Sequence, residues 1–503
     1  MNPIREPVTP PARRVGWPLL AVLGLGVIGL ATAWLTVGSS ITGSSEDQPE
    51  RMVEAVVGSP ARINPLFVHL NDTDRDLSSL VFSGLTRLGP NGQILPDLAD
   101  TWDISPDGKQ VTFRLRRGVV WQSGSSFTAD DVVFTYSLLA DPNLPGDPEQ
   151  APLWRQVQCT NPDQLTVVCQ LQAAFAPFLA YTTVGILPKS ILQGVDGKSL
   201  HDNSFNENPV GTGPYRLVDM NSERAVLRAN HSYYLGVPAI EEVDFQFFAD
   251  TGSAAKAVEQ HKADSLFVSA DTRSAAIDAL ASTDGVKAYT ANRASYTILY
   301  LNNGSPPTNE PAVRRAIAEA IDVDNIAGDL LGGRALKAAS PVAPGTWAFN
   351  ASVQPYDHDE SAARKLLDDA GWAVPEKGDV RQRAGISLAL KIATDEDPVR
   401  GAVADRVVDQ LRKVGIDASV ERRESTALVR DFLLPRQYQA AIFGWDPGPD
   451  PDPYPAWHSS QAGRNGRNLA DYRSQKADNL MEQARRAFKP DQRQGLYYNF
   501  QQV

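Results

Sequence analysis

Residues 386–443 alternate between segments with strand periodicity and segments with helix periodicity, and this alternation constrains the fold more than any other feature. Asp397 and Pro398 open one of the helices, whose apolar side chains recur on one face before Gly415 ends it. Strand, helix, strand, helix and strand follow in turn, at residues 386–392, 397–415, 416–420, 426–434 and 438–443. This order is typical of an α/β sheet with a ligand crevice at the carboxyl ends of its strands.

The segment that follows the last of these strands is a candidate binding loop. Residues 442–457 read I-F-G-W-D-P-G-P-D-P-D-P-Y-P-A-W, and the prolines exclude both a helix and a central strand. The resulting stiff loop places Trp445 and Tyr454 beside Asp446 and Asp450, and aromatic rings with carboxylates suit a ligand pocket. The alternative is a proline-stiffened surface turn with solvated acids.

The N-terminal region contains an uncharged run at residues 17–37 that is long enough to cross a bilayer as a helix. Basic residues before it predict a cytoplasmic tail at residues 1–16, with everything after the run outside the cell. Residues 38–50 form a polar tether. We therefore expect a single-pass protein of the cell membrane with an extracytoplasmic globular part. A cleaved signal peptide is the alternative, since residues 31–33 are small enough for cleavage.

Composition and motifs exclude several function classes. The 503 residues suggest roughly two to four domains. A net charge of −12 leaves no domain-sized basic face for nucleic acid. The six histidines are scattered, and the sequence contains no HExxH, GxSxG, Walker A or GxGxxG motif. We therefore expect a protein with no catalytic residues, no metal site and no cofactor.

The two cysteines, Cys159 and Cys169, flank a turn signal between two strand-like runs. Pairing Thr160 with Leu165 would place the two sulfurs on opposite faces of the hairpin, whereas a one-residue bulge would bring them together diagonally. An extracytoplasmic location permits a disulfide. Both the bonded and the free state stay open from the sequence.

Four further stretches, taken together, resemble extracytoplasmic solute-binding proteins of family 5, which serve peptide/nickel-type ABC importers. Residues 96–133 contain P-D-L-A-D-T-W, F-R-L-R-R-G-V-V-W-Q-S-G and A-D-D-V, which are similar to the family's first conserved segment. Residues 208–217 contain N-P-V-G-T-G-P-Y, residues 313–322 read V-R-R-A-I-A-E-A-I-D, and residues 445–460 carry the G-W, D-P-D and W-H-S-S pattern. The four stretches occur in the family's order.

This resemblance implies a two-lobed periplasmic-binding-protein-like fold of class II, with an extra subdomain inserted in lobe I. The expected boundaries are 51–90 and 205–295 for lobe I, 91–204 for the inserted subdomain, and 296–503 for lobe II. Family members usually return to lobe I after lobe II, and we expect that return to be missing here because the chain ends within a predicted helix.

The function that the resemblance implies is the capture of a small solute between two lobes and its delivery to an ABC transporter permease. The solute would be an oligopeptide, a modified peptide or an oligosaccharide. Gly448 stands where amine-gripping members place an aspartate, so specificity for free peptides is open. The alternatives are a ligand sensor for a signalling partner and, with less support, an extracytoplasmic hydrolase using Asp450 and Asp452.

The expected ligand contacts come from three places in the chain. Trp445, Asp446, Asp450 and Tyr454 lie on the proline-rich loop. Asn302 lies where we expect the chain to cross between the lobes, and Asn71 lies near the start of lobe I.

Overall fold

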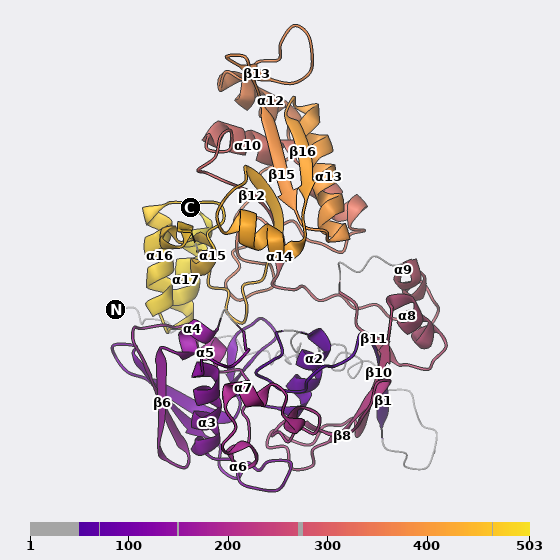
Figure 1. Ribbon diagram of the computed structural model, residues 1–503, viewed down its shortest axis with the longest axis vertical. Helices are drawn as coiled ribbons and strands as arrows, with labels where there is room; N and C mark the ends of the chain where they lie inside the picture. Colours follow the sequence, from indigo (N-terminus) through magenta and orange to yellow (C-terminus); the bar gives the residue numbers. More distant parts are fainter. Residues whose placement is uncertain (1–49, 70, 148–149, 270–274, 465) are drawn as a thin grey trace, which may run out of the picture.

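The computed structural model describes residues 50–69, 71–147, 150–269, 275–464 and 466–503. No helix within these ranges is long and apolar enough to cross a membrane. The predicted membrane span at residues 17–37 lies outside the described residues. The described chain forms three sheets of four or five strands, which we call sheets A, B and C (Figure 1).

Sheet A has the strand order β11-β1-β10-β9-β8, and β1 runs parallel to both of its neighbours. Helix α2 (Asp72–Val81) packs Leu77 into the core on one face. Helix α8 (Thr251–Glu259) packs Ala254 against Ala55 on the other face. The strands are β1 (Arg51–Val57), β8 (Tyr215–Met220), β9 (Arg224–Ala229), β10 (Glu242–Phe248) and β11 (Ser265–Leu266). Helix α9 (Ala275–Ala281) follows beside α8.

Sheet B is antiparallel with the order β4-β5-β7-β6, and its inner face packs Phe113 and Val167 against α3 (Ala129–Ala140). A capping box begins α3, since the carboxylate of Asp131 accepts a hydrogen bond from the backbone N–H of Thr128 at 2.9 Å. The strands are β4 (Ala99–Ile104), β5 (Gln110–Leu115), β6 (Val157–Asp163) and β7 (Thr166–Leu171). Around them lie the short pair β2 (Thr86–Leu88) and β3 (Ile94–Pro96) and the helices α4 (Ala151–Trp154), α5 (Phe178–Tyr181), α6 (Lys189–Leu192) and α7 (Gly197–Leu200).

The hairpin β6–β7 holds a disulfide between Cys159 and Cys169, which lie directly opposite each other on neighbouring strands. The regular register, in which Thr160 would pair with Leu165, is not the one observed, since Thr160 pairs with Val168. A register shift between Thr160 and the turn lengthens the connection, so both sulfurs point to the same face of the sheet.

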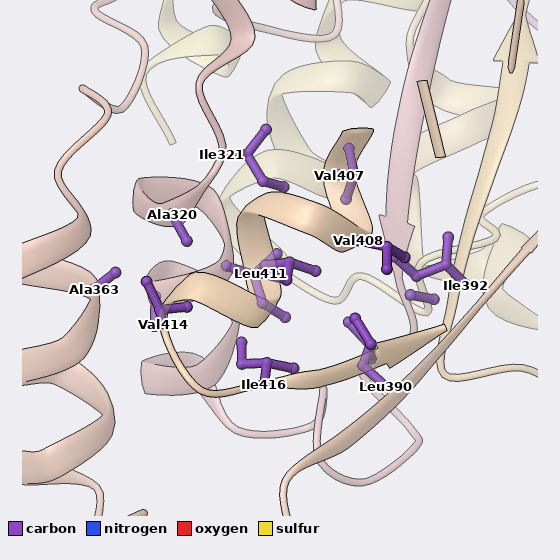
Figure 2. Close-up of a cluster of buried hydrophobic side chains, with 14 of the residues drawn as sticks. Ala320, Ile321, Ala363, Leu390, Ile392, Val407, Val408, Leu411, Val414 and Ile416 are labelled. Atoms are coloured by element: carbon purple, nitrogen blue, oxygen red, sulfur yellow. The ribbon is translucent and has the colours of Figure 1, made fainter. Parts of the chain in front are cut away.

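Sheet C has the order β12-β17-β15-β16 and buries the largest aliphatic cluster of this part of the chain against three helices (Figure 2). Asp397 caps α13 (Pro398–Lys413) by accepting from Arg400 N at 2.8 Å, and Leu411 enters the core. Gly415 follows with φ +87°, as a helix-terminating glycine requires. The other elements are β12 (Tyr296–Leu301), α10 (Pro311–Ala320), α12 (Glu360–Asp369), β15 (Ala389–Thr394), β16 (Asp417–Arg422) and β17 (Ala440–Trp445).

Two predicted elements of this region differ from the structure. The strand expected at residues 386–392 is divided into β14 (Ile386–Ser387), which pairs with β13 (Gln382–Arg383), and β15. The helix expected at residues 426–434 is a single turn, α14 (Ser425–Ala427), that continues as a π-helix. Another short helix, α11 (Val323–Asn325), likewise continues as a π-helix.

Strand directions bring the proline-rich loop to the edge of sheet C at which the chain enters. Strand β15 is parallel to both β16 and β17, so all three end at the same edge. Strand β12 is antiparallel to β17, and its first residue, Tyr296, pairs with Trp445. Because the chain reaches Tyr296 from sheet A, this edge faces sheet A, and Figure 1 shows α14, which follows β16, on that side of sheet C.

The chain continues from the loop through α15 (Tyr454–Trp457) into two antiparallel helices, α16 (Gln475–Arg486) and α17 (Pro490–Gln501). We call α16 and α17 the C-terminal helix pair. They lie beside α15 and next to the sheet B region around α4 and α5 (Figure 1). The loop is therefore enclosed between sheet C and this helix pair.

Candidate ligand-binding site

The end of β17 presents an aromatic ring followed by a carboxylate. Trp445 is half-buried, and Asp446 is exposed. One carboxylate oxygen of Asp446 accepts a hydrogen bond from the backbone N–H of Gly448 at 2.9 Å. Gly448 has φ +75°, so a glycine suits this tight turn. Within the part of the chain that the structure describes, Asp446 has no cationic side chain within ion-pair distance.

Asp450 has a partner within the protein. It is 4% exposed, and its two oxygens accept hydrogen bonds from the Arg493 guanidinium of α17 at 2.6 and 2.7 Å. The same guanidinium donates to the Tyr497 hydroxyl at 2.7 Å. Burial lowers the pKa of Arg493, but the charge of Asp450 outweighs it and the pKa of Arg493 is raised. Burial also raises the pKa of Asp450, against the opposing charge and hydrogen bonds of Arg493. Both oxygens of Asp450 are thus occupied by an internal ion pair.

Asp452 and Tyr454 share a second arginine of the helix pair. Arg485 Nε donates to Asp452 at 2.7 Å, and its guanidinium carbon lies 3.6 Å from the centre of the Tyr454 ring. The other contacts of Tyr454 are a ring stack on His458 at 4.0 Å and a hydrogen bond between its hydroxyl and the Ser460 hydroxyl at 3.1 Å. These contacts hold the second half of the loop on α16.

The W-H-S-S segment is attached to the same helix. Asp478 of α16 accepts from the backbone N–H of Ser459 at 2.9 Å. His458 is 6% exposed, and its Nδ1 accepts from Ser460 N at 3.1 Å. Its Nε2 lies 3.4 Å from the Glu482 carboxylate and, among the described residues, makes no hydrogen bond. The motif therefore serves here to fasten the loop.

Asn302 lies at the wrong end of sheet C for the expected crossing. It follows the last residue of β12, whereas the chain enters the sheet at the first residue, Tyr296. Its side chain is 4% exposed and donates to the backbone oxygens of Arg436 and Tyr438 at 3.1 and 2.8 Å. The prediction that Asn302 marks the crossing is wrong, because β12 carries the chain to the opposite edge before Asn302 is reached.

Asn71 is the N-cap of α2. Its side-chain oxygen accepts from Thr73 N at 2.8 Å, and its amide donates to the Ser59 oxygen at 2.9 Å. These bonds satisfy one of the free N–H groups of the helix and fix the loop before it. The structure thus places Asn71 in the sheet A part of the molecule, whereas Trp445 lies at the edge of sheet C.

Sequence reasoning missed an ion pair at the same edge of sheet C as Trp445. Asp395 follows β15, is 1% exposed, and binds Arg400 through both of its oxygens at 2.8 and 2.6 Å. Burial raises the pKa of Asp395, but the hydrogen bonds and charge of Arg400 outweigh it and the pKa is lowered. The Arg400 guanidinium also lies 5.6 Å from the Phe443 ring. The only signal for it in the sequence is the acid that follows a strand end.

A second group missed by sequence reasoning lies on sheet A. Glu54 of β1 accepts a hydrogen bond from the Ser265 hydroxyl, and burial raises its pKa to about 7. Burial also raises the pKa of Asp76 on α2 to about 6, while the charges of Arg75 and, more weakly, Arg293 oppose the rise. Because Arg293 lies three positions before Tyr296, the first residue of β12, this group lies close to the point at which the chain leaves for sheet C.

The candidate site residues therefore lie on two sides of the crossing segment 293–296, with the Glu54 group on sheet A and Trp445 at the edge of sheet C. Within the described residues, no group of three or more histidine, cysteine, aspartate or glutamate side chains is placed to hold a metal ion. The arrangement offers carboxylates and aromatic rings, which suit cationic and apolar groups of a ligand.

Comparison with known proteins identifies the family. The family model for "Bacterial extracellular solute-binding proteins, family 5 Middle" matches residues 93–466, well over half of the chain. The oligopeptide-binding protein AppA of Bacillus subtilis is 26% identical, over 94% of this chain and 88% of its own.

Two solved structures extend the comparison. AppA in complex with a nonapeptide superposes with a TM-score of 0.67 at 25% identity, covering 90% of this chain and 91% of its own. NikZ of Campylobacter jejuni in complex with Ni(L-His) superposes with a TM-score of 0.69 at 27% identity, covering 90% of each chain. The shared architecture is the two-lobed α/β fold of periplasmic binding proteins. The chain belongs to family 5 of the bacterial extracellular solute-binding proteins.

Proposed function

We propose that this protein is the solute-binding component of an ABC importer, which captures a peptide or peptide-like solute between two lobes and delivers it to the membrane permease. Sheet A, from residues 51–90 and 205–295, would form lobe I, and sheet B, from residues 91–204, its inserted subdomain. Sheet C and the helix pair, residues 296–503, would form lobe II. Family membership and the likeness to peptide-bound AppA support this assignment.

The observation that carries the proposal is the position of Trp445 and Asp446 at the edge of sheet C where the chain enters from sheet A. The Trp445 ring offers a flat apolar surface, and Asp446 offers a carboxylate for a ligand cation such as an amine. Asp446 is the acid of the loop with no cationic side chain beside it among the described residues, since Arg493 and Arg485 hold the other two.

The other predicted contacts act indirectly in this proposal. Asp450 and Tyr454 hold the loop on the helix pair, and Asn71 fixes the loop before α2. Asn302 fastens the far end of β12 to the residues before β17. Trp445 and Asp446 are therefore the residues for which we expect direct ligand contact.

Two other features, an uncharged run and a disulfide, support the proposed location of the protein at the cell membrane. The uncharged run at residues 17–37 would hold the protein at the cell membrane with its globular part outside. The disulfide between Cys159 and Cys169 suits an oxidising extracytoplasmic compartment.

Native mass spectrometry of the protein as purified tests the proposal, because a solute captured between two lobes is expected to co-purify. The released compound is then identified by fragmentation. In parallel, thermal unfolding is followed with a dipeptide, a nonapeptide, Ni(L-His) and maltotriose as separate probes. A probe present at 100 times its Kd stabilises the folded state by roughly 2.7 kcal/mol.

Stabilisation by a peptide supports the proposal. Stabilisation by Ni(L-His) or maltotriose alone would assign a different solute class. The absence of both a co-purified compound and any stabilisation would contradict the solute-binding function.

A further inference from the structure

The C-terminal helix pair joins the binding loop to the sheet B region, directly through Arg485 and indirectly through Arg493 and Trp347. Arg485 binds Asp452 and Tyr454 of the loop, and its guanidinium carbon also lies 5.2 Å from the Phe175 ring of the sheet B region. Arg493 binds Asp450, and its guanidinium carbon lies 5.2 Å from the Trp347 ring.

Backbone contacts reinforce this junction. The N–H of Ala176 donates to the backbone oxygen of Arg485 at 2.6 Å. The N–H of Trp347 donates to the backbone oxygen of Asn91, in the turn between β2 and β3, at 3.0 Å. Phe488, just after α16, lies against Gly108 in the turn between β4 and β5, where Ala174 also lies. Backbone hydrogen bonds and ring packing of this kind resist separation of the two surfaces.

The opposite side of the molecule is joined differently. An arm of the chain follows the π-helix after α11 and carries Gly332 and Gly333, both with positive φ. Its Arg334 forms an ion pair with Asp278 of α9. The Asp278 side chain is 68% exposed. Solvent-exposed ion pairs hold two surfaces together only weakly, and glycine constrains the backbone less than any other residue.

The binding loop is held at both of its ends. The loop leaves sheet C at Trp445 and is bound to the helix pair from Asp450 onward. Arg436, just before β17, donates to the backbone oxygens of Gln461, Gly463, Gly466 and Asn468, so the segment before α16 is fastened to sheet C. These bonds favour relative motion at the contacts with sheets A and B.

We propose that the contact of Arg485 with Phe175 and Ala176 is the pivot of lobe closure, and that Arg485 is the positioning residue that keeps the binding loop beside this pivot. Points near a pivot move least, so the loop keeps its place against the inserted subdomain while the Arg334 side opens and closes. The inference rests on the proposed function only in taking lobe closure as the working motion.

Distance measurements between spin labels test the pivot without any ligand. The native cysteines are bonded to each other, so introduced cysteines alone take the label. One pair, Ser137→Cys with Gln483→Cys, spans the junction between α3 and α16, and both positions are exposed. A second pair, Lys256→Cys with Asp409→Cys, spans α8 and α13 on the opposite side and is likewise exposed.

In the otherwise unchanged protein we expect a narrow distance distribution for the junction pair and a broader one for the opposite pair. Phe175→Ala and Arg485→Lys should each broaden the junction distribution about twofold, because each removes one of the two planar groups that stack. Arg485→Lys keeps the positive charge beside Asp452. Arg486→Lys is the matched control, since the neighbouring Arg486 is exposed and pairs only with Glu482 among the described ion pairs.

A junction distribution as broad as the opposite one would overturn the pivot. So would equal junction widths in Phe175→Ala, Arg485→Lys and the control, with circular dichroism showing all three folded. Because no ligand is added, failure to find a solute would contradict the proposed function and leave these distances as an independent test of the pivot.

Discussion

Arg493 holds both carboxylate oxygens of Asp450 at 2.6 and 2.7 Å, and 43 positions of sequence separate the two residues. The pair is buried beneath the binding loop, and the Tyr497 hydroxyl accepts a further hydrogen bond from the same guanidinium. Asp450 therefore serves the binding loop by fixing its path. This leaves Asp446 as the loop carboxylate that faces solvent.

Replacing Asp450 should destabilise the protein far more than replacing Asp446. Asp450→Ala leaves the Arg493 charge buried without its partner, a loss of about 3–5 kcal/mol in the free energy of unfolding. Asp446→Ala removes one exposed hydrogen bond to Gly448 N, and we expect a change of about 1 kcal/mol or less. Urea unfolding of the two variants gives the comparison. Equal midpoints would show that the Asp450–Arg493 pair contributes little.

Ligand affinity should show the reverse order, since replacing Asp446 at the end of β17 should weaken binding more than replacing Asp450. Asp446→Asn removes the charge from a charge-assisted contact, with a loss of about 1.5–3 kcal/mol in binding, which is roughly tenfold to hundredfold in Kd. Trp445→Ala should likewise weaken binding more than it lowers the unfolding midpoint. Calorimetry with the solute identified by mass spectrometry measures both. A Trp445→Ala protein that loses stability and affinity in parallel would place that ring in the core.

Gly448 offers a gain-of-function test. The family resemblance implies that Gly448 stands where amine-gripping members carry an aspartate, and a Cβ at this position would meet no atom within 4 Å. Gly448→Asp should therefore fold, with a conformational cost of about 1–2 kcal/mol because φ is +75°. Binding of a peptide with a free amine should tighten, while binding of the N-acetylated peptide should not. Equal changes for both peptides would argue against an amine site at this turn.

The pH dependence of stability should report Asp97, which lies where sheet B meets the segment after β9. Burial raises the pKa of Asp97 from 3.8 to about 6, although the Tyr234 hydroxyl donates a hydrogen bond to it. A raised carboxyl pKa means that the folded state binds the proton more tightly than the unfolded state. The stabilisation that this tighter proton binding gives the folded state is fully present below pH 3.8 and is lost as the pH rises through about 6.

Asp97→Asn removes the buried charge, so we expect it to be more stable than the parent protein at pH 8, by about 1–3 kcal/mol. The difference should shrink toward pH 4, as thermal unfolding across this range would show. Asp100→Asn is the control, because Asp100 is 60% exposed and pairs with Arg116. A pH-independent difference between Asp97→Asn and the parent would contradict the assignment.

Local patterns in the sequence determined the elements whose stabilising contacts lie within one turn or one strand. Asp397 and Gly415 delimit α13 because capping and termination involve neighbours only a few residues away. The Thr128 capping box behaves in the same way. The alternation of residues 386–443 correctly predicts an α/β sheet, and strand direction places the binding loop at a carboxyl edge.

Tertiary structure alone decided which side chains remain free for a ligand. The loop contains Asp446, Asp450 and Asp452 within seven residues, and nothing local distinguishes them. The packing of α16 and α17 brings Arg485 and Arg493 to two of these acids and leaves the third exposed. Asn302 was misplaced for a related reason, since its position depends on the direction of β12 against β17. Charge partners and strand directions are set by segments distant in the chain, and periodicity carries no information about them.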